Sequence, residues 1–348
     1  MSALGGPGRL PVALVLAVSL AACGPRSEPY HHQQILAFGT LVDVTLWGVD
    51  AEVAGEAFRV LGQELNWMHD AWHAWHPSSV TDLNRQLQSG EPFVPDPGVL
   101  PLVEMSRDFS IKSGHLFNPA IGKLIALWGY QADEPGKTPP EPAAVAGLVR
   151  QNPRMDDIRY EGASLRGRNP AVQLDFGGFA KGYGVDRAVE RLQAMGIRNA
   201  IVAAAGDIRV IGRHGDRPWR IGIRHPRQPG AIASLDMEGD ENISTSGDYE
   251  RYFEHAGRRY HHIIDPRTGY PAQGTASVTV VAHNGALADA AATGLFVAGP
   301  REWRKTAASL GVDQVMLVAT DGTVYMTPGM AQRVSFEVTP APTVVVEP

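Results

Sequence analysis

The chain has a single cysteine, Cys23, in 348 residues. One thiol cannot form an intramolecular disulfide, so an oxidising compartment is neither required nor excluded. Lysine and arginine form no run of five or more residues, and the formal net charge is −6 with a pI near 6.1. Because a nucleic-acid backbone is bound by a basic surface, we expect no nucleic-acid partner.

The amino-terminal region lacks an apolar run of transmembrane length. Leu10 to Ala22 is apolar but too short to span a bilayer comfortably, and Arg9 precedes it, as expected for an export signal. The stretch ends in Leu-Ala-Ala-Cys, which resembles the processing box of bacterial lipoproteins. We therefore expect a signal peptide at residues 1–22, a lipid on Cys23 and a tether at residues 23–36. The alternative is an ordinary cleavage site beside a chance cysteine.

The remaining chain, 44% hydrophobic overall, is long enough for one large domain, which we place at residues 37–338 with a disordered tail at 339–348. Hydrophobic periodicity and turn signals mix helices with strands and show no regular βαβ repeat. This order favours an α+β fold with mainly antiparallel strands. Helices are predicted at 52–73, 97–112, 118–130, 181–195, 285–297 and 301–310, and strands at 41–47, 171–175, 200–204, 219–224, 231–237, 260–264 and 277–282, with further short strands between 314 and 338.

Two glycines follow Asp175 in the segment Asp-Phe-Gly-Gly-Phe-Ala-Lys, which ends at Lys181 where a helix is predicted to begin. Free N–H groups and the positive end of the helix dipole favour an anion there, and Lys181 adds a full charge. A phosphate is the expected ligand. A Gly-Gly turn that serves tight packing alone is the competing interpretation.

A histidine pair, His261 and His262, precedes a loop rich in turn residues, Asp-Pro-Arg-Thr-Gly-Tyr-Pro. A histidine at the mouth of a rigid loop beside a phosphate site is able to take a proton from an attacking hydroxyl. The simpler interpretation is a hairpin turn with an exposed histidine.

Asp289 and Thr293 are four residues apart, which puts a carboxylate and a hydroxyl on one face of a predicted helix. Two hard oxygen donors suit Mg²⁺, which takes one or two carboxylates and completes its shell with other oxygens. An aspartate in a first helical turn is more often a cap or a partner of the helix dipole.

Taken together and in this order, the three segments resemble the ApbE family, the FAD:protein FMN transferases, also called thiamine-biosynthesis lipoproteins. The resemblance extends from Phe38 to Gly299 and includes Trp75-His-Pro-Ser-Ser, Phe117-Asn-Pro-Ala-Ile-Gly, Gly206-Asp-Ile-Arg and Ser244-Thr-Ser-Gly-Asp. It implies an ApbE-like, T-fold-related domain.

The resemblance also implies a role for each matching residue. Gly178 (through its carbonyl), Asp289 and Thr293 would hold Mg²⁺ against the FAD pyrophosphate, and His262 would activate the acceptor hydroxyl. The residues that would bind FAD are Phe38, Trp75, Leu116, Phe117, Asn118, Asp175, Lys181 and Ile263.

The implied reaction uses FAD as a substrate and Mg²⁺ as a cofactor. A Ser or Thr hydroxyl of a partner protein would accept FMN while AMP leaves. The enzyme would be anchored in the bacterial cell envelope through Cys23, facing the periplasm. Two residues depart from the family pattern: Phe38 replaces the usual methionine, and Asn118 replaces the usual aspartate, which leaves an acidic role there in doubt.

Other interpretations stay open at this stage. Water in place of the acceptor hydroxyl would make the protein an FAD pyrophosphatase, and a flavin-binding lipoprotein without activity would need only the anchor and the pocket. His69, His73 and His76 have spacings that suit zinc or haem, although a helix end whose tryptophans cover core or flavin explains them more simply.

Overall fold

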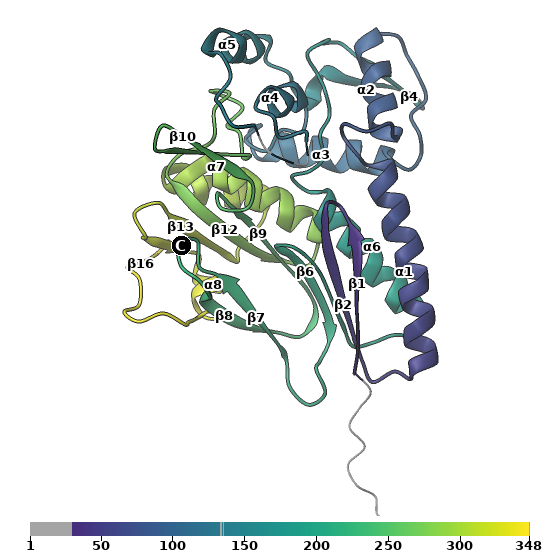
Figure 1. Ribbon diagram of the computed structural model, residues 1–348, viewed down its shortest axis with the longest axis vertical. Coiled ribbons are helices and arrows are strands. Elements are labelled where there is room, and N and C mark those ends of the chain that lie inside the picture. Colours follow the sequence, from purple (N-terminus) through teal and green to yellow (C-terminus); the bar gives the residue numbers. More distant parts are fainter. Residues whose placement is uncertain (1–29, 133, 135, 348) are drawn as a thin grey trace, which may run out of the picture.

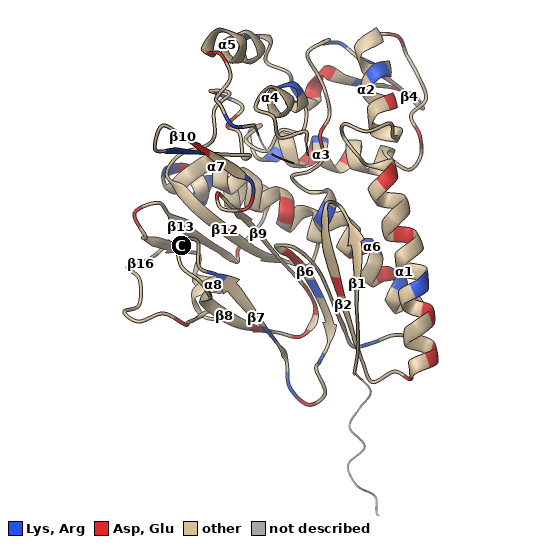
Figure 2. Cartoon of the chain, viewed as in Figure 1, with Lys and Arg blue, Asp and Glu red and all other residues tan. Residues whose placement is uncertain are grey.

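The computed structural model describes residues 30–132, 134 and 136–347. The signal peptide, Cys23 and the first part of the expected tether lie outside the described residues. A nine-stranded sheet forms the centre of the molecule, with long helices on one face and a small three-stranded sheet on the other (Figure 1). Acidic and basic residues are interspersed along the elements (Figure 2).

The central sheet is antiparallel except at its last pair, where β14 and β16 run parallel. Its spatial order is β1-β2-β5-β6-β9-β12-β13-β14-β16. The strands span Tyr30–Ala37 (β1), Thr40–Trp47 (β2), Ala200–Ala204 (β5), Asp207–Gly212 (β6), Gly239–Gly247 (β9), Thr275–Ala282 (β12), Val315–Ala319 (β13), Val324–Met326 (β14) and Val344–Val346 (β16).

Three helices cover one face of this sheet. They are α1 (Ala51–Ala71), α6 (Ala180–Ala194) and α7 (Gly285–Leu310). Helix α1 begins where the Asp50 side chain accepts a hydrogen bond from Val53 N, and its buried stripe packs with α6 on β2 and β5. Helix α7 merges the two helices predicted from the sequence: Gly299 has φ +69° and Pro300 follows it, which breaks the helix into two segments.

The opposite face is covered by β7 (Trp219–Arg224) and β8 (Ala231–Met237), whose apolar side chains pack against β6, β12 and β13. The short strand β15 (Ser335–Phe336) pairs with β8, and helix α8 (Pro328–Ala331) precedes it. Because both faces are covered, the central strands are buried.

A second group of elements lies beyond one end of the sheet, near α7 (Figure 1). It consists of α2 (Ser79–Ser89), α3 (Leu100–Lys112), α4 (Gly122–Leu127), α5 (Pro142–Gln151), the 3₁₀ turn η1 (Met155–Asp157) and the hairpin β3 (Ile158–Glu161) and β4 (Ser164–Gly167). A hairpin of β10 (Tyr252–His255) and β11 (Arg258–His261) lies beside it. Helices α2 and α5 were not predicted from the sequence.

Three sequence-based expectations are wrong. Residues 30–36 of the expected tether form most of β1, whose inward side chains Ile35 and Ala37 are buried. The tail expected to be disordered contains β16, in which three consecutive valines pair with β14. Residues 171–175 form only an isolated bridge, between Gln173 and Ile121, and the Asn84 side chain bonds both backbone groups of Leu174.

Candidate active site

The glycine turn after Asp175 leads into α6 as predicted. The Asp175 carboxylate accepts hydrogen bonds from Gly177 N at 3.0 Å and from Gln131 Nε2 at 3.0 Å. Phe179, at the N-cap of α6, makes no side-chain capping bond. In the first turn of α6, however, Ala180 N–H donates to Phe176 O and Gly182 N–H donates to Asp289 Oδ2, so the free N–H groups expected here for an anion are largely occupied.

Helix α7 brings the predicted metal ligands to this turn. The Thr293 hydroxyl donates to the carbonyl of Gly178 over 3.3 Å, and the Asp289 carboxylate accepts from Gly182 N over 3.1 Å. Asp289 is 4% exposed. Three oxygen donors of different kinds, from two segments more than 100 residues apart in the sequence, thus converge between α6 and α7.

Lys181 supplies the positive charge in this region. Its ammonium group lies 3.0 Å from Asp207 Oδ2 and 3.7 Å from Asp289 Oδ2. Burial alone would lower the pKa of Lys181, but the charges of Asp207 and Asp289 outweigh burial and raise it. Burial, together with the charge of Asp207, raises the pKa of Asp289. The site therefore has a surplus of negative potential, which favours a cation.

His262 follows β11 and is half-buried. Its backbone N–H and its Nδ1 both lie close to the carbonyl of Arg251, at 3.0 Å and 3.2 Å. A carbonyl only accepts, so Nδ1 carries the proton and Nε2 keeps its lone pair. Loss of hydration, and then the charges of neighbouring groups including Lys181, lower the pKa of His262 well below its ordinary value. His262 is therefore a neutral base at pH 7.

A short segment links the histidine to the glycine turn. The Tyr130 ring lies 6.2 Å from that of His262, the next residue, Gln131, bonds Asp175, and Arg251 Nη2 donates to Ala132 O at 2.7 Å. The three segments singled out in the sequence therefore meet in one region of the fold.

The apolar residues predicted to bind FAD fall into three groups. Phe117 lies under the glycine turn, since a Cβ on Gly178 would be 3.4 Å from its ring. Leu116 and Ile263 pack in one buried cluster with α7. Phe38 stacks on Trp72 at 6.1 Å and contacts Gly184 of α6. Each group lies beside a segment of the site.

Trp75 and Asn118 are less directly connected to the site. The Trp75 ring contacts those of His73 and His76, beyond the end of α1. The Asn118 amide donates to Pro153 O and accepts from Ala120 N, so both ends of this side chain hold the local backbone. The next residue, Pro119, accepts a hydrogen bond from Asp175 N.

Comparisons with known proteins identify the family of the chain. The sequence profile of the ApbE family matches residues 38–316. A relative from Rhodobacter capsulatus, named FAD:protein FMN transferase, is 42% identical over 92% of this chain, which spans 62% of that protein. A relative of the same name from Treponema pallidum is 33% identical over 94% of this chain and 95% of its own length. The chain belongs to the ApbE family.

Solved structures of the ApbE family show the same fold. The ApbE protein of Thermotoga maritima has a TM-score of 0.79 at 28% identity, and the flavin transferase ApbE of Vibrio cholerae has a TM-score of 0.78 at 27% identity. Each comparison covers 88% of this chain and 99% of the other chain. The family resemblance, the α+β fold and the flavin-transferase class expected from the sequence are confirmed.

The ApbE-family site contains residues for which the sequence suggested no role. Asp207 was noted only as part of a Gly-Asp motif, yet it is the nearest partner of Lys181. Ser246, in the Ser-Thr-Ser-Gly motif, lies with its hydroxyl 3.2 Å from that of Thr293. The motifs drew attention to the segments that contain Asp207 and Ser246. Only the fold shows that these two residues contact Lys181 and Thr293.

The donor set suits Mg²⁺ by its chemistry. Gly178 O, the Asp289 carboxylate and the Thr293 hydroxyl are hard oxygen ligands, and a single carboxylate with room for phosphate oxygens is typical of Mg²⁺ sites. The Oδ1 atom of Asp207 is buried and has no hydrogen-bond partner among the described residues. This unpaired oxygen makes the site more favourable for a cation. Within the described part of the chain, no cluster of three or more His, Cys, Asp or Glu side chains is arranged to hold a metal.

The histidines at the end of α1 lie close together without forming such a cluster. The rings of His69 and His73 are 5.5 Å apart, and those of His73 and His76 are 4.3 Å apart. His69 Nδ1 accepts a hydrogen bond from Phe38 N, and His73 Nδ1 accepts from His76 N. These nitrogens satisfy backbone donors, which agrees with the structural interpretation of the motif.

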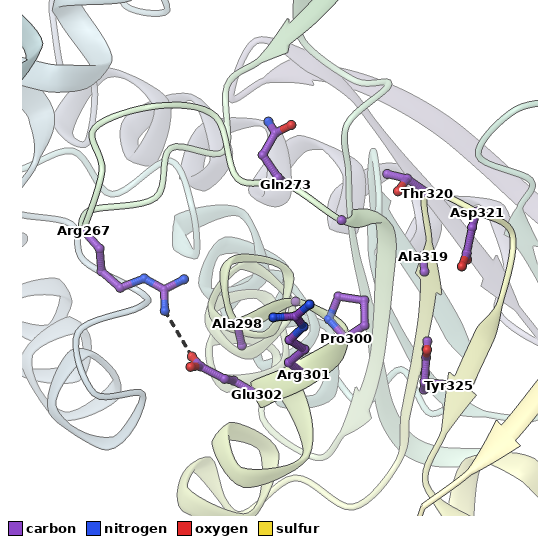
Figure 3. A pocket seen from close by; sticks show the side chains of 12 residues that line it. Arg267, Gln273, Ala298, Pro300, Arg301, Glu302, Ala319, Thr320, Asp321 and Tyr325 are labelled. Atoms are coloured by element: carbon purple, nitrogen blue, oxygen red, sulfur yellow. Dashed lines mark hydrogen bonds and ion pairs between the residues drawn. The ribbon is translucent and has the colours of Figure 1, made fainter.

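A cavity of about 450 Å³ lies away from this site, at the break in α7 (Figure 3). Its lining includes Arg267 and Glu302, which form an ion pair at 3.0 Å, and Gln273 on the facing loop. None of the predicted site residues lines it. Across the described residues, no helix combines the length and the apolarity needed to cross a bilayer.

Proposed function

We propose that this chain transfers the FMN part of FAD to a Ser or Thr hydroxyl of another protein, with Mg²⁺ as cofactor and AMP as the leaving group. The observation that carries the proposal is the convergence of Gly178, Lys181, Asp289 and Thr293 beside a neutral His262. The names of the relatives support the transfer of FMN to protein, and the donor set supports the metal.

Different residues of the chain would bind the pyrophosphate, the metal and the rings of FAD. The Lys181 ammonium, at the start of α6, suits the pyrophosphate of FAD. Gly178 O, Asp289 and Thr293 would hold Mg²⁺, which when bound neutralises phosphate charge and polarises the phosphorus under attack. Phe38, which is half-buried, offers apolar surface to a ring of FAD, and the buried Phe117 and Ile263 would support the site from beneath.

His262 acts on the acceptor. Its Nε2 takes the proton of the hydroxyl as the hydroxyl oxygen forms a bond to the phosphorus of the FMN half. The bond between that phosphorus and the bridging oxygen breaks, and the bridging oxygen leaves with AMP. The products are a phosphoester-linked FMN on the protein and free AMP, with no oxidation or reduction.

The test is a reaction of the purified protein with FAD, Mg²⁺ and a candidate acceptor protein. Transfer gives an acceptor that is heavier by one FMN and fluoresces in a denaturing gel, with one AMP released per label. Release of FMN and AMP without labelled protein would indicate an FAD pyrophosphatase, which uses the same site with water. FAD binding without any product would indicate a flavin-binding protein.

We further propose that the protein is a lipoprotein of the bacterial cell envelope, anchored through Cys23 and facing the periplasm. The support is the Leu-Ala-Ala-Cys motif after a short apolar segment. Labelling of the expressed protein with a fatty acid, and loss of the label in Cys23→Ala, would agree with this proposal. Equal labelling of both proteins would contradict it.

A further inference from the structure

Helix α6 and the turn just before it meet α7 through three contacts with a regular spacing. Thr293 Oγ1 donates to Gly178 O at 3.3 Å, Gly182 N donates to Asp289 Oδ2 at 3.1 Å, and Gly285 N donates to Asp186 Oδ2 at 2.8 Å. From one contact to the next, the chain advances four residues on the α6 side and goes back four residues on the α7 side. We call this set of three contacts the ladder.

The spacing of the ladder follows from helix geometry. Residues four apart lie on the same face of a helix, so an antiparallel pair of helices repeats its contacts with this step. The first two contacts contain the proposed Mg²⁺ ligands. The third contact, between Asp186 and Gly285, contains no proposed ligand. Gly285 precedes Asp289 in α7, whereas Thr293 follows it.

Two glycines allow the close approach. A Cβ on Gly182 would lie 2.3 Å from Gly285 O, and a Cβ on Gly285 would lie 2.8 Å from Gly182 O. The backbones of the two helices are therefore in direct contact at this level. At this separation, a small shift along the helix axis would remove the bond between Gly182 and Asp289.

Asp186 fixes the start of α7 from outside the helix. Its Oδ2 also accepts from Ala286 N at 3.2 Å, while Asn284, the N-cap of α7, accepts from Leu287 N. A carboxylate at a helix N-terminus is stabilised by free N–H groups and by the helix dipole. Asp186 therefore holds two of the first N–H groups of α7.

Asp186 is itself held by a buried charge network. Its Oδ1 accepts from Arg209 Nη1 at 2.8 Å, and Arg209 also forms a two-bond pair with Asp240 on β9. Asp186 is 5% exposed and Arg209 is 8% exposed. The end of the ladder is thus tied to β6 and β9 of the central sheet by charge-assisted hydrogen bonds.

We propose that Asp186 is a positioning residue for the metal site: it fixes the register of α7 against α6 and so sets the distances among Gly178 O, Asp289 and Thr293. This proposal rests on the Mg²⁺ site of the proposed function. The hydrogen bonds of Asp186 go to Arg209, Gly285 and Ala286, and none of these is a proposed metal ligand. Its effect reaches them through the two helix backbones and through Gly182.

A positioning role differs from a merely structural one in what a substitution changes. Loss of a structural cap lowers the melting temperature but leaves the Mg²⁺ concentration needed for half-saturation unchanged. Loss of a positioning residue raises that concentration, because misplaced ligands bind the ion less well, whereas turnover at saturating Mg²⁺ recovers. Loss of a residue that orients a metal ligand typically lowers metal affinity by about 10- to 100-fold.

The experiment compares Asp186→Asn with Val189→Ala in the full-length protein. The first substitution keeps the side chain nearly the same size, but the new amide cannot accept hydrogen bonds from α7 and from Arg209 at once. Val189 is fully buried on the same helix and packs toward α1 and the sheet, so its truncation destabilises α6 without touching the ladder. Melting temperature is measured at fixed FAD over a series of Mg²⁺ concentrations.

We expect Asp186→Asn to raise the half-saturating Mg²⁺ concentration by about tenfold or more, and Val189→Ala to change it by less than about twofold. Equal values for Asp186→Asn and the wild type would overturn the positioning role while leaving the metal site intact. A wild-type protein that does not respond to Mg²⁺ would overturn the metal site itself. If Asp186→Asn does not fold, Asp186→Glu keeps the charge, lengthens the cap by one methylene group and is expected to shift the same concentration.

Discussion

The ammonium group of Lys181 lies 3.7 Å from the carboxylate of Asp289, the proposed metal ligand. Asp207 lies 3.0 Å from the same ammonium group, so one half-buried cation pairs with two buried carboxylates. Such a site is short of positive charge, and isolated buried charge is costly. A divalent cation beside Asp289 would remove this deficit, which links the electrostatics of the fold to the proposed need for Mg²⁺.

Asp289→Asn should therefore abolish most of the response to Mg²⁺. The amide keeps the shape of the side chain but loses the charge, and loss of a direct ligand should weaken Mg²⁺ binding by at least about tenfold. Turnover as a function of Mg²⁺ concentration measures this effect. Asp321→Asn, in an exposed turn after β13, is the control and should behave as the wild type. Mg²⁺-dependent turnover that persists in Asp289→Asn would show that the ligand is misassigned.

His262→Ala should slow the transfer of FMN by about 10²- to 10⁴-fold, the usual contribution of a positioned general base. FAD affinity should change little, because the proposed role of the imidazole is at the acceptor hydroxyl. Single-turnover labelling of the acceptor and equilibrium FAD binding are measured on the same preparation. An equal loss of binding and transfer would assign His262 to the structure of the loop instead.

The sequence allowed the site segments to be predicted but not their contacts. The spacing of Asp289 and Thr293 placed both on one helical face, and the structure puts that face against Gly178 and Gly182. The long helices with clear periodicity were predicted for the same reason. Nothing in the sequence showed that Asp186, four residues beyond Gly182, bonds the first turn of a helix about 100 residues later.

The expectations that failed depended on long-range pairing. Polar residues at 30–36 resemble a tether, and only their pairing with β2 makes them a strand. Residues 171–175 have the composition of a strand, but they pair only through an isolated bridge at Gln173, and Asn84 occupies both backbone groups of Leu174. Local composition is a weak guide where a single side chain or a distant strand supplies the hydrogen bonds.

Gly182→Ala should destabilise the protein and weaken its response to Mg²⁺ together. The added methyl group would lie 2.3 Å from Gly285 O and 2.8 Å from Asp289 Cβ, and relief of such overpacking typically costs about 1 to 3 kcal/mol. Urea unfolding gives the free energy of unfolding for each protein.

Gly62→Ala is the matched control for that change. Gly62 lies within α1 with no atom within 4 Å of an added Cβ, so the same substitution should stabilise the protein by about 0.5 to 1 kcal/mol. Effects of the same sign at Gly62 and Gly182 would contradict the close contact between α6 and α7.

The stability of the protein should depend on pH through His262 between pH 7 and pH 5. Burial lowers the pKa of His262 to about 3, whereas an ordinary histidine has a pKa of 6.5. In this window the unfolded chain binds a proton that the folded chain does not bind, so the free energy of unfolding falls as the pH falls through 6.5. The contribution lost between pH 7 and pH 5 is at most about 2 kcal/mol.

His262→Gln isolates this contribution, because glutamine does not titrate and its amide still reaches the carbonyl of Arg251. Urea unfolding of both proteins at pH 7, 6 and 5, without metal, should show the wild type losing up to about 2 kcal/mol relative to His262→Gln. Other titrating groups are common to the two proteins and cancel in the difference. A difference that stays constant with pH would mean that His262 keeps an ordinary pKa in the folded protein, and the neutral base would then be present only above about pH 6.5.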